Sequence, residues 1–170
     1  EACREAGLPV PIVRGWSAEG LIVIDAARGE PLLSAGWEPE ALLDRVDDLR
    51  SGLTRVRIAS TTPGIASRLD WCTGHAEGDP EAMALAQRIG QMLPTADPAK
   101  ETVVHGDLHA GQLFLSDGAL TGMIDVDTLG RGAPAEDPAA FIAHAIASAV
   151  LSSGEHRTRM ASLADAATRR

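Results

Sequence analysis

The sequence predicts an α+β fold in which long helices predominate and the strands are few and short. Apolar residues recur at helical spacing over residues 38–53 and again over 79–93, with polar or charged residues between them. The apolar runs that suit strands are much shorter, only three to five residues each. Two of these runs flank a turn at 116–118, which is the pattern of a hairpin.

In the N-terminal part, the sequence predicts the end of a helix and then one strand. Residues 1–6 have the pattern of a helix that Gly7 and Pro9 terminate. Residues 21–25 (LIVID) form an apolar, β-branched run, which is typical of a buried strand. Residues 26–31 then form a connector that leads toward the first long helix.

Two amphipathic helices are predicted in the middle of the chain. The first covers 38–53, where apolar residues recur three or four positions apart. The second covers 79–93 and has a clear start, because Asp79 suits the N-cap and Pro80 the first turn. Residues 54–78 between them show no pattern that predicts an element.

The C-terminal part supplies the remaining strands and helices. A short strand is predicted over 102–104, and the hairpin strands over 113–115 and 120–124. Asp137 precedes a proline and an apolar helical stretch, so we expect it to cap the next helix. Residues 154–170 are expected to be helical.

Composition narrows the classes of function. The 170 residues suit about one domain. With 15 Lys and Arg against 24 Asp and Glu, the net charge is −9, which is unfavourable for binding nucleic acid. No run of about 18 uninterrupted apolar residues would span a membrane. Cys3 and Cys72 are too few for a disulfide framework. We therefore expect a cytoplasmic protein without nucleic-acid or membrane partners.

Two carboxylates between residues 102 and 138 indicate the chemistry. Asp107 follows a short strand, and Asp125 lies at the end of the hairpin that comes next. Phosphoryl transfer needs one carboxylate to orient the attacking hydroxyl and another to hold Mg²⁺ against the nucleotide phosphates. The amide oxygen of Gln112 is a further hard ligand of the kind that Mg²⁺ prefers.

These residues carry a family resemblance. Residues 105–112 (HGDLHAGQ) resemble the catalytic loop of the aminoglycoside phosphotransferase and choline kinase group of kinase-like enzymes. Residues 124–127 (IDVD) resemble that family's metal-binding aspartate motif, and 137–141 (DPAAF) its Asp-Pro segment. The order and the short separations also match. The resemblance implies a protein-kinase-like fold in which residues 1–32 are a remnant of the small lobe and the hinge, and residues 33–170 form a mostly helical large lobe.

The resemblance also implies a function and its residues. The family transfers the γ-phosphoryl group of ATP, with Mg²⁺, to a hydroxyl of a small molecule, here an aminoglycoside-, sugar- or choline-like acceptor. Asp107 would be the catalytic base or orienting group. Asp125 and Gln112 would hold the metal ion. The carbonyl of Asp25 and the amide of Ala27, in the hinge, would face the adenine.

The sequence departs from the family in two places. The family usually has Asn where this chain has Gln112. Its glycine-rich phosphate loop and strand lysine precede the hinge, whereas the single lysine here, Lys100, follows it. We therefore expect these 170 residues alone to show little phosphotransferase activity.

Other interpretations remain open at this point. His105, Asp107 and His109 alternate along the chain and are candidate ligands of a zinc hydrolase. A kinase-like module without catalysis is another. Asp127 is a candidate second metal ligand or a loop-capping residue. His144, which belongs to no motif, is expected to be a surface or packing residue. The oligomeric state is not predicted.

Overall fold

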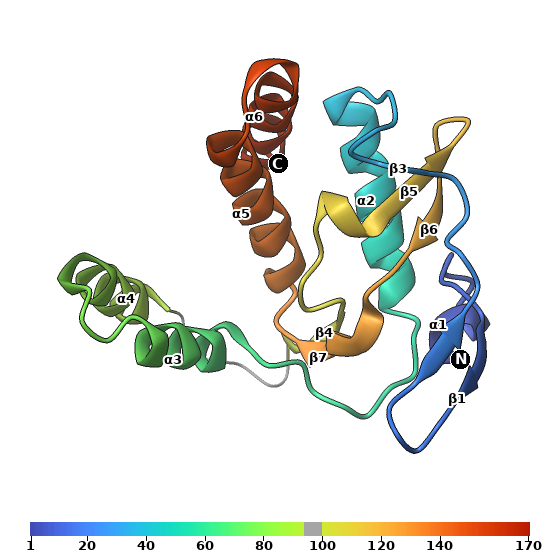
Figure 1. The fold of residues 1–170 in the computed structure, drawn as a ribbon, viewed down its shortest axis with the longest axis horizontal. Helices are drawn as coiled ribbons and strands as arrows, with labels where there is room; N and C mark the ends of the chain where they lie inside the picture. The colour runs from blue at the N-terminus through green and yellow to red at the C-terminus, as the bar shows by residue number, and fades with distance from the viewer. Residues whose placement is uncertain (94–99) are drawn as a thin grey trace.

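The computed structural model describes residues 1–93 and 100–170 (Figure 1). Helices dominate it, and its strands form three small antiparallel sheets. The α+β class predicted from the sequence is thereby confirmed. None of the described helices has the length and apolar character needed to cross a membrane.

The N-terminal part consists of a short helix and a hairpin. Helix α1 (Ala2–Glu5) ends before Gly7, as predicted, and strands β1 (Val13–Trp16) and β2 (Ile22–Ile24) pair antiparallel. The predicted strand is present, but its predicted burial is wrong, because Ile22, Val23 and Ile24 are 64%, 51% and 52% exposed. Alternate residues of a strand face opposite sides, so the described part of the chain covers neither face of β2.

The core lies between helices α2, α5 and α6 and a three-stranded sheet. Helix α2 (Pro39–Leu53) begins one residue after its predicted start. Helices α5 (Glu136–Leu151) and α6 (Gly154–Thr168) pack against each other, and α6 also contacts α2. Strands β3 (Glu30–Pro31), β5 (Leu113–Ser116) and β6 (Ala119–Met123) form the sheet in the order β3-β5-β6. The apolar residues at helical spacing that predicted α2 are all buried in the core: Leu42, Val46, Leu49 and Leu53.

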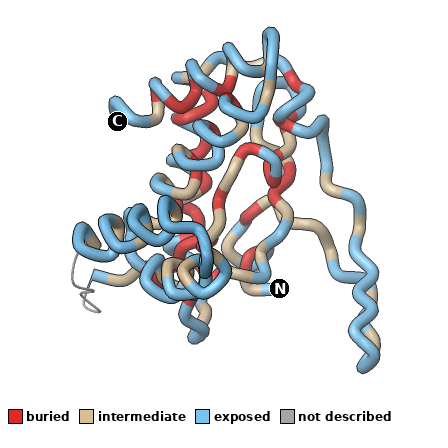
Figure 2. Tube along the Cα trace, turned by 60° about the vertical axis from the view of Figure 1, so that its left-hand side comes forward, coloured by how far each residue is buried: buried red, intermediate tan, exposed pale blue. Residues whose placement is uncertain are grey.

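Helices α3 and α4 project from this body as an arm (Figure 1). Helix α4 (Pro80–Met92) starts as predicted, with Asp79 accepting hydrogen bonds from the backbone of its first turn. Helix α3 (Ile65–His75) lies in the segment where the sequence predicted no element. Neither helix contains a buried residue, and Figure 2 shows the buried positions concentrated in the rest of the molecule. We call residues 65–92 the arm.

A two-stranded ladder positions residues 105–112, the segment that was predicted to be the catalytic loop. Strand β4 (Thr102–Val104) pairs with β7 (Gly130–Gly132), and the loop leaves β4 directly after Val104. A short 3₁₀ turn, η2 (Ala110–Gln112), leads from the loop into β5, and a second, η3 (Val126–Thr128), follows β6. The loop and the end of β6 therefore meet beside the same ladder.

Candidate active site

The catalytic loop is fixed at its start by Asp137. The backbone N–H groups of His105 and Gly106 each donate to one oxygen of this carboxylate at 2.9 Å. Asp137 is 1% exposed. Its predicted role as a helix cap is wrong, because α5 begins at Glu136 with Ala135 as its N-cap. Asp137 lies inside the first turn, where its side chain extends to the loop instead.

His105 braces the loop from within. Its ring is inaccessible to solvent, and its Nε2 lies 3.3 Å from the carbonyl of Ile124. The carbonyl of His105 accepts a hydrogen bond from Thr128 Oγ1 at 2.8 Å. Gly106 has a φ of +87°, and a Cβ there would lie 2.8 Å from the carbonyl oxygen of Thr128. A larger residue would therefore displace the loop.

The carboxylate of Asp107 is half-buried and faces two basic side chains from distant parts of the chain. Arg68 Nη1, on α3, lies 3.6 Å from Asp107 Oδ1, and His144 Nε2, on α5, lies 3.5 Å from the same oxygen. The sequence did not predict either contact. The spacing of His144 could have predicted its contact. His144 lies seven residues after Asp137, so the two side chains share the face of α5 toward the loop.

His109 lies beside Asp107, and Gln112 links its backbone to Asp125. Its Nδ1 accepts a hydrogen bond from the N–H of Gly111 at 3.1 Å, and its ring stacks on His144 with the centroids 4.3 Å apart. Burial and His144 lower the pKa of His109, although Asp107 and Asp125 act to raise it. Because Nδ1 accepts this hydrogen bond, the neutral ring carries its proton on Nε2.

Gln112 and Asp125 complete the group. Gln112 is 2% exposed, and its Nε2 donates to Asp125 Oδ2 at 3.3 Å. Asp125 lies at the surface in the left-handed region, with φ 63° and ψ 47°, a backbone conformation that is uncommon outside glycine. The structure therefore gathers Asp107, Gln112 and Asp125 around His109. Oxygen donors of this kind fit Mg²⁺.

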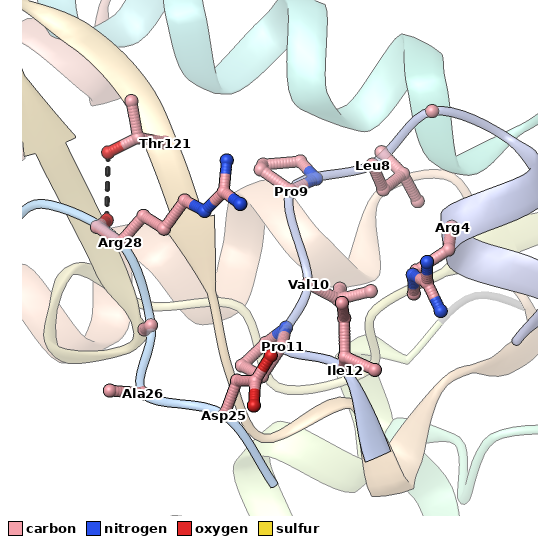
Figure 3. A pocket seen from close by; sticks show the side chains of 12 residues that line it. Arg4, Leu8, Pro9, Val10, Pro11, Ile12, Asp25, Ala26, Arg28 and Thr121 are labelled. Carbon is pink, nitrogen blue, oxygen red and sulfur yellow. Dashed lines mark hydrogen bonds between the residues drawn. The ribbon is translucent and has the colours of Figure 1, made fainter. Parts of the chain in front are cut away.

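Asp25 and Ala27, which were predicted to belong to the hinge, line one of two neighbouring cavities. Asp25 and Ala27 line a cavity of about 380 Å³ behind the hairpin, together with residues 7–12 (Figure 3). Arg14 forms two hydrogen bonds of 2.7 Å with the carboxylate of Asp25 and holds its pKa below the usual value. A second cavity, of about 320 Å³, reaches from Ile24 at the end of β2 to Asp125. This cavity lies between β2 and the segment that was predicted to bind a metal ion.

The zinc triad considered from the sequence is not assembled. Among the described residues, the group whose ligand atoms lie within 4.8 Å of one another is Asp107, His109 and His144. His105 is turned into the core and takes no part in it.

A catalytic-loop aspartate braced by a buried histidine, and a second aspartate at the end of a hairpin, define a kinase-like phosphotransferase lobe. The sequence model of the phosphotransferase enzyme family (APH) matches residues 26–164, and the chain belongs to this family. No curated protein sequence matches the chain.

Solved structures share the fold. Aminoglycoside phosphotransferase APH(3'')-Id from Streptomyces rimosus, in complex with ADP and streptomycin, superposes with a TM-score of 0.65 at 21% identity, over 96% of this chain and 70% of that one. An aminoglycoside-3'-phosphotransferase of type VIII gives 0.58 at 22% identity, over 96% and 76%. An amicoumacin kinase with AMP-PNP and Ca²⁺ gives 0.60 at 15% identity, over 99% and 57%. The chain thus corresponds to part of each of these enzymes.

Proposed function

We propose that this chain is the catalytic part of a cytoplasmic, ATP-dependent phosphotransferase that moves the γ-phosphoryl group to a hydroxyl of a small molecule. The observation that carries the proposal is that Asp107 lies in one cluster with His109 and His144, while the side chain of Gln112 links the backbone of His109 to Asp125. Neighbours crystallised with ADP and streptomycin, or with AMP-PNP, support a nucleotide and a small-molecule acceptor. An aminoglycoside-, sugar- or choline-like compound is the acceptor class.

Each residue has a distinct role in this proposal. Asp107 orients the acceptor hydroxyl and accepts its proton. Asp125, with Gln112 beside it, holds Mg²⁺, which neutralises charge on the nucleotide phosphates. The backbone carbonyl of Asp25 and the amide of Ala27 bind the adenine edge.

Nucleotide binding and transfer are tested separately. Calorimetry with Mg²⁺ and AMP-PNP measures whether the 170-residue chain binds a nucleotide. Phosphorus NMR then follows transfer from ATP to a panel of aminoglycosides, sugars and choline. The transfer assay uses a protein that also carries the phosphate loop and lysine of the family. Binding without transfer to any acceptor would indicate a kinase-like module without catalysis, and no binding would contradict the proposal.

A further inference from the structure

Arg68 joins the arm to the catalytic loop through all three of its guanidinium nitrogens. Nε donates to the carbonyl of Pro63 at 3.1 Å, just before α3 begins. Nη2 donates to the carbonyl of Gly106, and Nη1 lies 3.6 Å from Asp107 Oδ1. The planar guanidinium has its donors in a fixed fork. The bond to Pro63 therefore sets the direction in which the other two nitrogens meet the loop.

Both basic neighbours of Asp107 meet the same oxygen. Arg68 and His144 approach Oδ1 from helices α3 and α5, and no described residue donates a hydrogen bond to Oδ2. The three side chains are each at least one-third exposed, so these contacts add little to stability. Their consequence is orientational: contacts from two directions on Oδ1 restrict rotation of the carboxylate and leave Oδ2 available.

We propose that Arg68 and His144 are positioning residues that clamp Oδ1 of Asp107 and present Oδ2 to the acceptor hydroxyl. The inference rests on the proposed function, because it concerns the geometry of the same carboxylate. Transfer rates are sensitive to such geometry, since a misplacement of about 1 Å costs roughly 100-fold in rate. The arm, which packs no residue into the core, thereby contributes to the catalytic site.

The geometry favours this clamp over a metal site at the same three residues. A metal-bound histidine normally donates its second ring N–H to a partner. In His109, however, Nδ1 accepts from the N–H of Gly111, so Nε2 retains its proton. The rings of His109 and His144 also stack at an interplanar angle of 22°. The in-plane lone pairs of stacked rings run side by side and do not converge on one ion.

Kinetics of the whole enzyme test the clamp. Arg68→Ala and His144→Ala should each lower kcat about tenfold or more, while the KM for the nucleotide changes less than about twofold. Arg68→Lys should recover part of kcat, because it retains a cation near Oδ1 but loses the fork. Arg88→Ala, on the exposed face of α4, and His156→Ala, on α6, are matched controls expected to behave as wild type. An unchanged kcat in both Arg68→Ala and His144→Ala would overturn the proposal.

Hydrogen exchange on the 170-residue chain gives a readout that does not require activity. Arg68→Ala should increase the exchange rates of the amides of residues 107–109, and Arg88→Ala should not. If the wild-type enzyme transferred no phosphate, the proposed function would be contradicted, and exchange would still report whether Arg68 holds the loop. Unchanged exchange in Arg68→Ala would overturn the role of Arg68 even in an active enzyme.

Discussion

Gln112 connects the backbone of the catalytic loop to the carboxylate of Asp125. Its Oε1 accepts from the N–H of His109 at 3.1 Å, and its Nε2 donates to Asp125 Oδ2 at 3.3 Å. Reversing the amide would bring two donors together at His109 and two acceptors together at Asp125, so these partners fix its orientation. The group that faces Asp125 is therefore a donor, and it orients the carboxylate. A metal ion would reach Gln112 only through Oε1, which has a second lone pair.

Substitutions at Gln112 distinguish these roles. Gln112→Leu has similar bulk and removes both hydrogen bonds, so we expect binding of Mg²⁺ and AMP-PNP to weaken about tenfold or more. Gln112→Asn is one methylene shorter and should retain part of the affinity and of the activity. Calorimetry on the 170-residue chain measures the affinity of both variants for Mg²⁺ and AMP-PNP. Wild-type affinity and Mg²⁺ dependence in Gln112→Leu would remove Gln112 from the metal site and make Asp127 the better candidate.

Asp107 and Asp125 should fail in different ways when each is changed to Asn. Asp107→Asn keeps the size of the side chain but removes its basicity, so kcat should fall at least about 100-fold with little change in nucleotide affinity. Asp125→Asn removes a charged ligand, so nucleotide affinity should fall together with kcat. Raised Mg²⁺ or added Mn²⁺ should partly restore the Asp125 variant. Equal losses of affinity in the two variants would contradict this division of roles.

Asp137→Ala should destabilise the protein strongly. The substitution leaves the buried N–H groups of His105 and Gly106 without acceptors, and we expect the free energy of unfolding to fall by about 3 kcal/mol or more. Urea denaturation measures the change. Asp48→Ala, an exposed position on α2, should lie within about 0.5 kcal/mol of wild type. A similarly small effect of Asp137→Ala would show that other contacts hold the loop.

The lowered pKa of His109 predicts a pH dependence with a definite sign. Below the unfolded-state value of about 6.5, the unfolded chain binds a proton that the folded ring still excludes. Stability should therefore rise with pH between the folded and unfolded pKa values and level off above about 6.5. Proton NMR should show His109 titrating below the ordinary histidine pKa of about 6.5. The variant His109→Gln should have a smaller slope of stability over this interval, and an identical slope would be inconsistent with the shift.

The elements with a buried face were predictable from the sequence. The apolar residues of α2 predicted the position of the helix and, to within one residue, its two ends, because these residues pack into the core. Burial alone does not decide this, because α4 was found although it contains no buried residue. Helix α4 has a capping Asp79 and a proline at its start, whereas α3 has no side-chain cap and was missed. The strand at Ile22–Ile24 was found by its β-branched residues. The exposure of this strand depends on whether another segment packs on the hairpin, and the composition of the strand does not show that.

For the site, the motifs located Asp107 and Asp125, but not their neighbours. Arg68 and His144 reach Asp107 from 39 residues before it and 37 after it, and contacts over such separations depend on the whole fold. Asp137 illustrates a subtler limit. A carboxylate at this position can cap a helix or accept hydrogen bonds from a distant loop. In this fold Asp137 accepts from the backbone of His105 and Gly106, which lie 32 and 31 residues earlier in the chain.

The left-handed backbone of Asp125 matters for protein engineering. Few side chains tolerate φ 63°, and a redesign that optimised thermal stability alone would favour glycine at this position. Such a variant would keep the hairpin and lose the carboxylate at its end. Stabilised versions of this protein should therefore exclude residue 125 from the set of positions that are varied. Gains in melting temperature should be sought in the exposed hairpin and at positions of the arm other than Arg68.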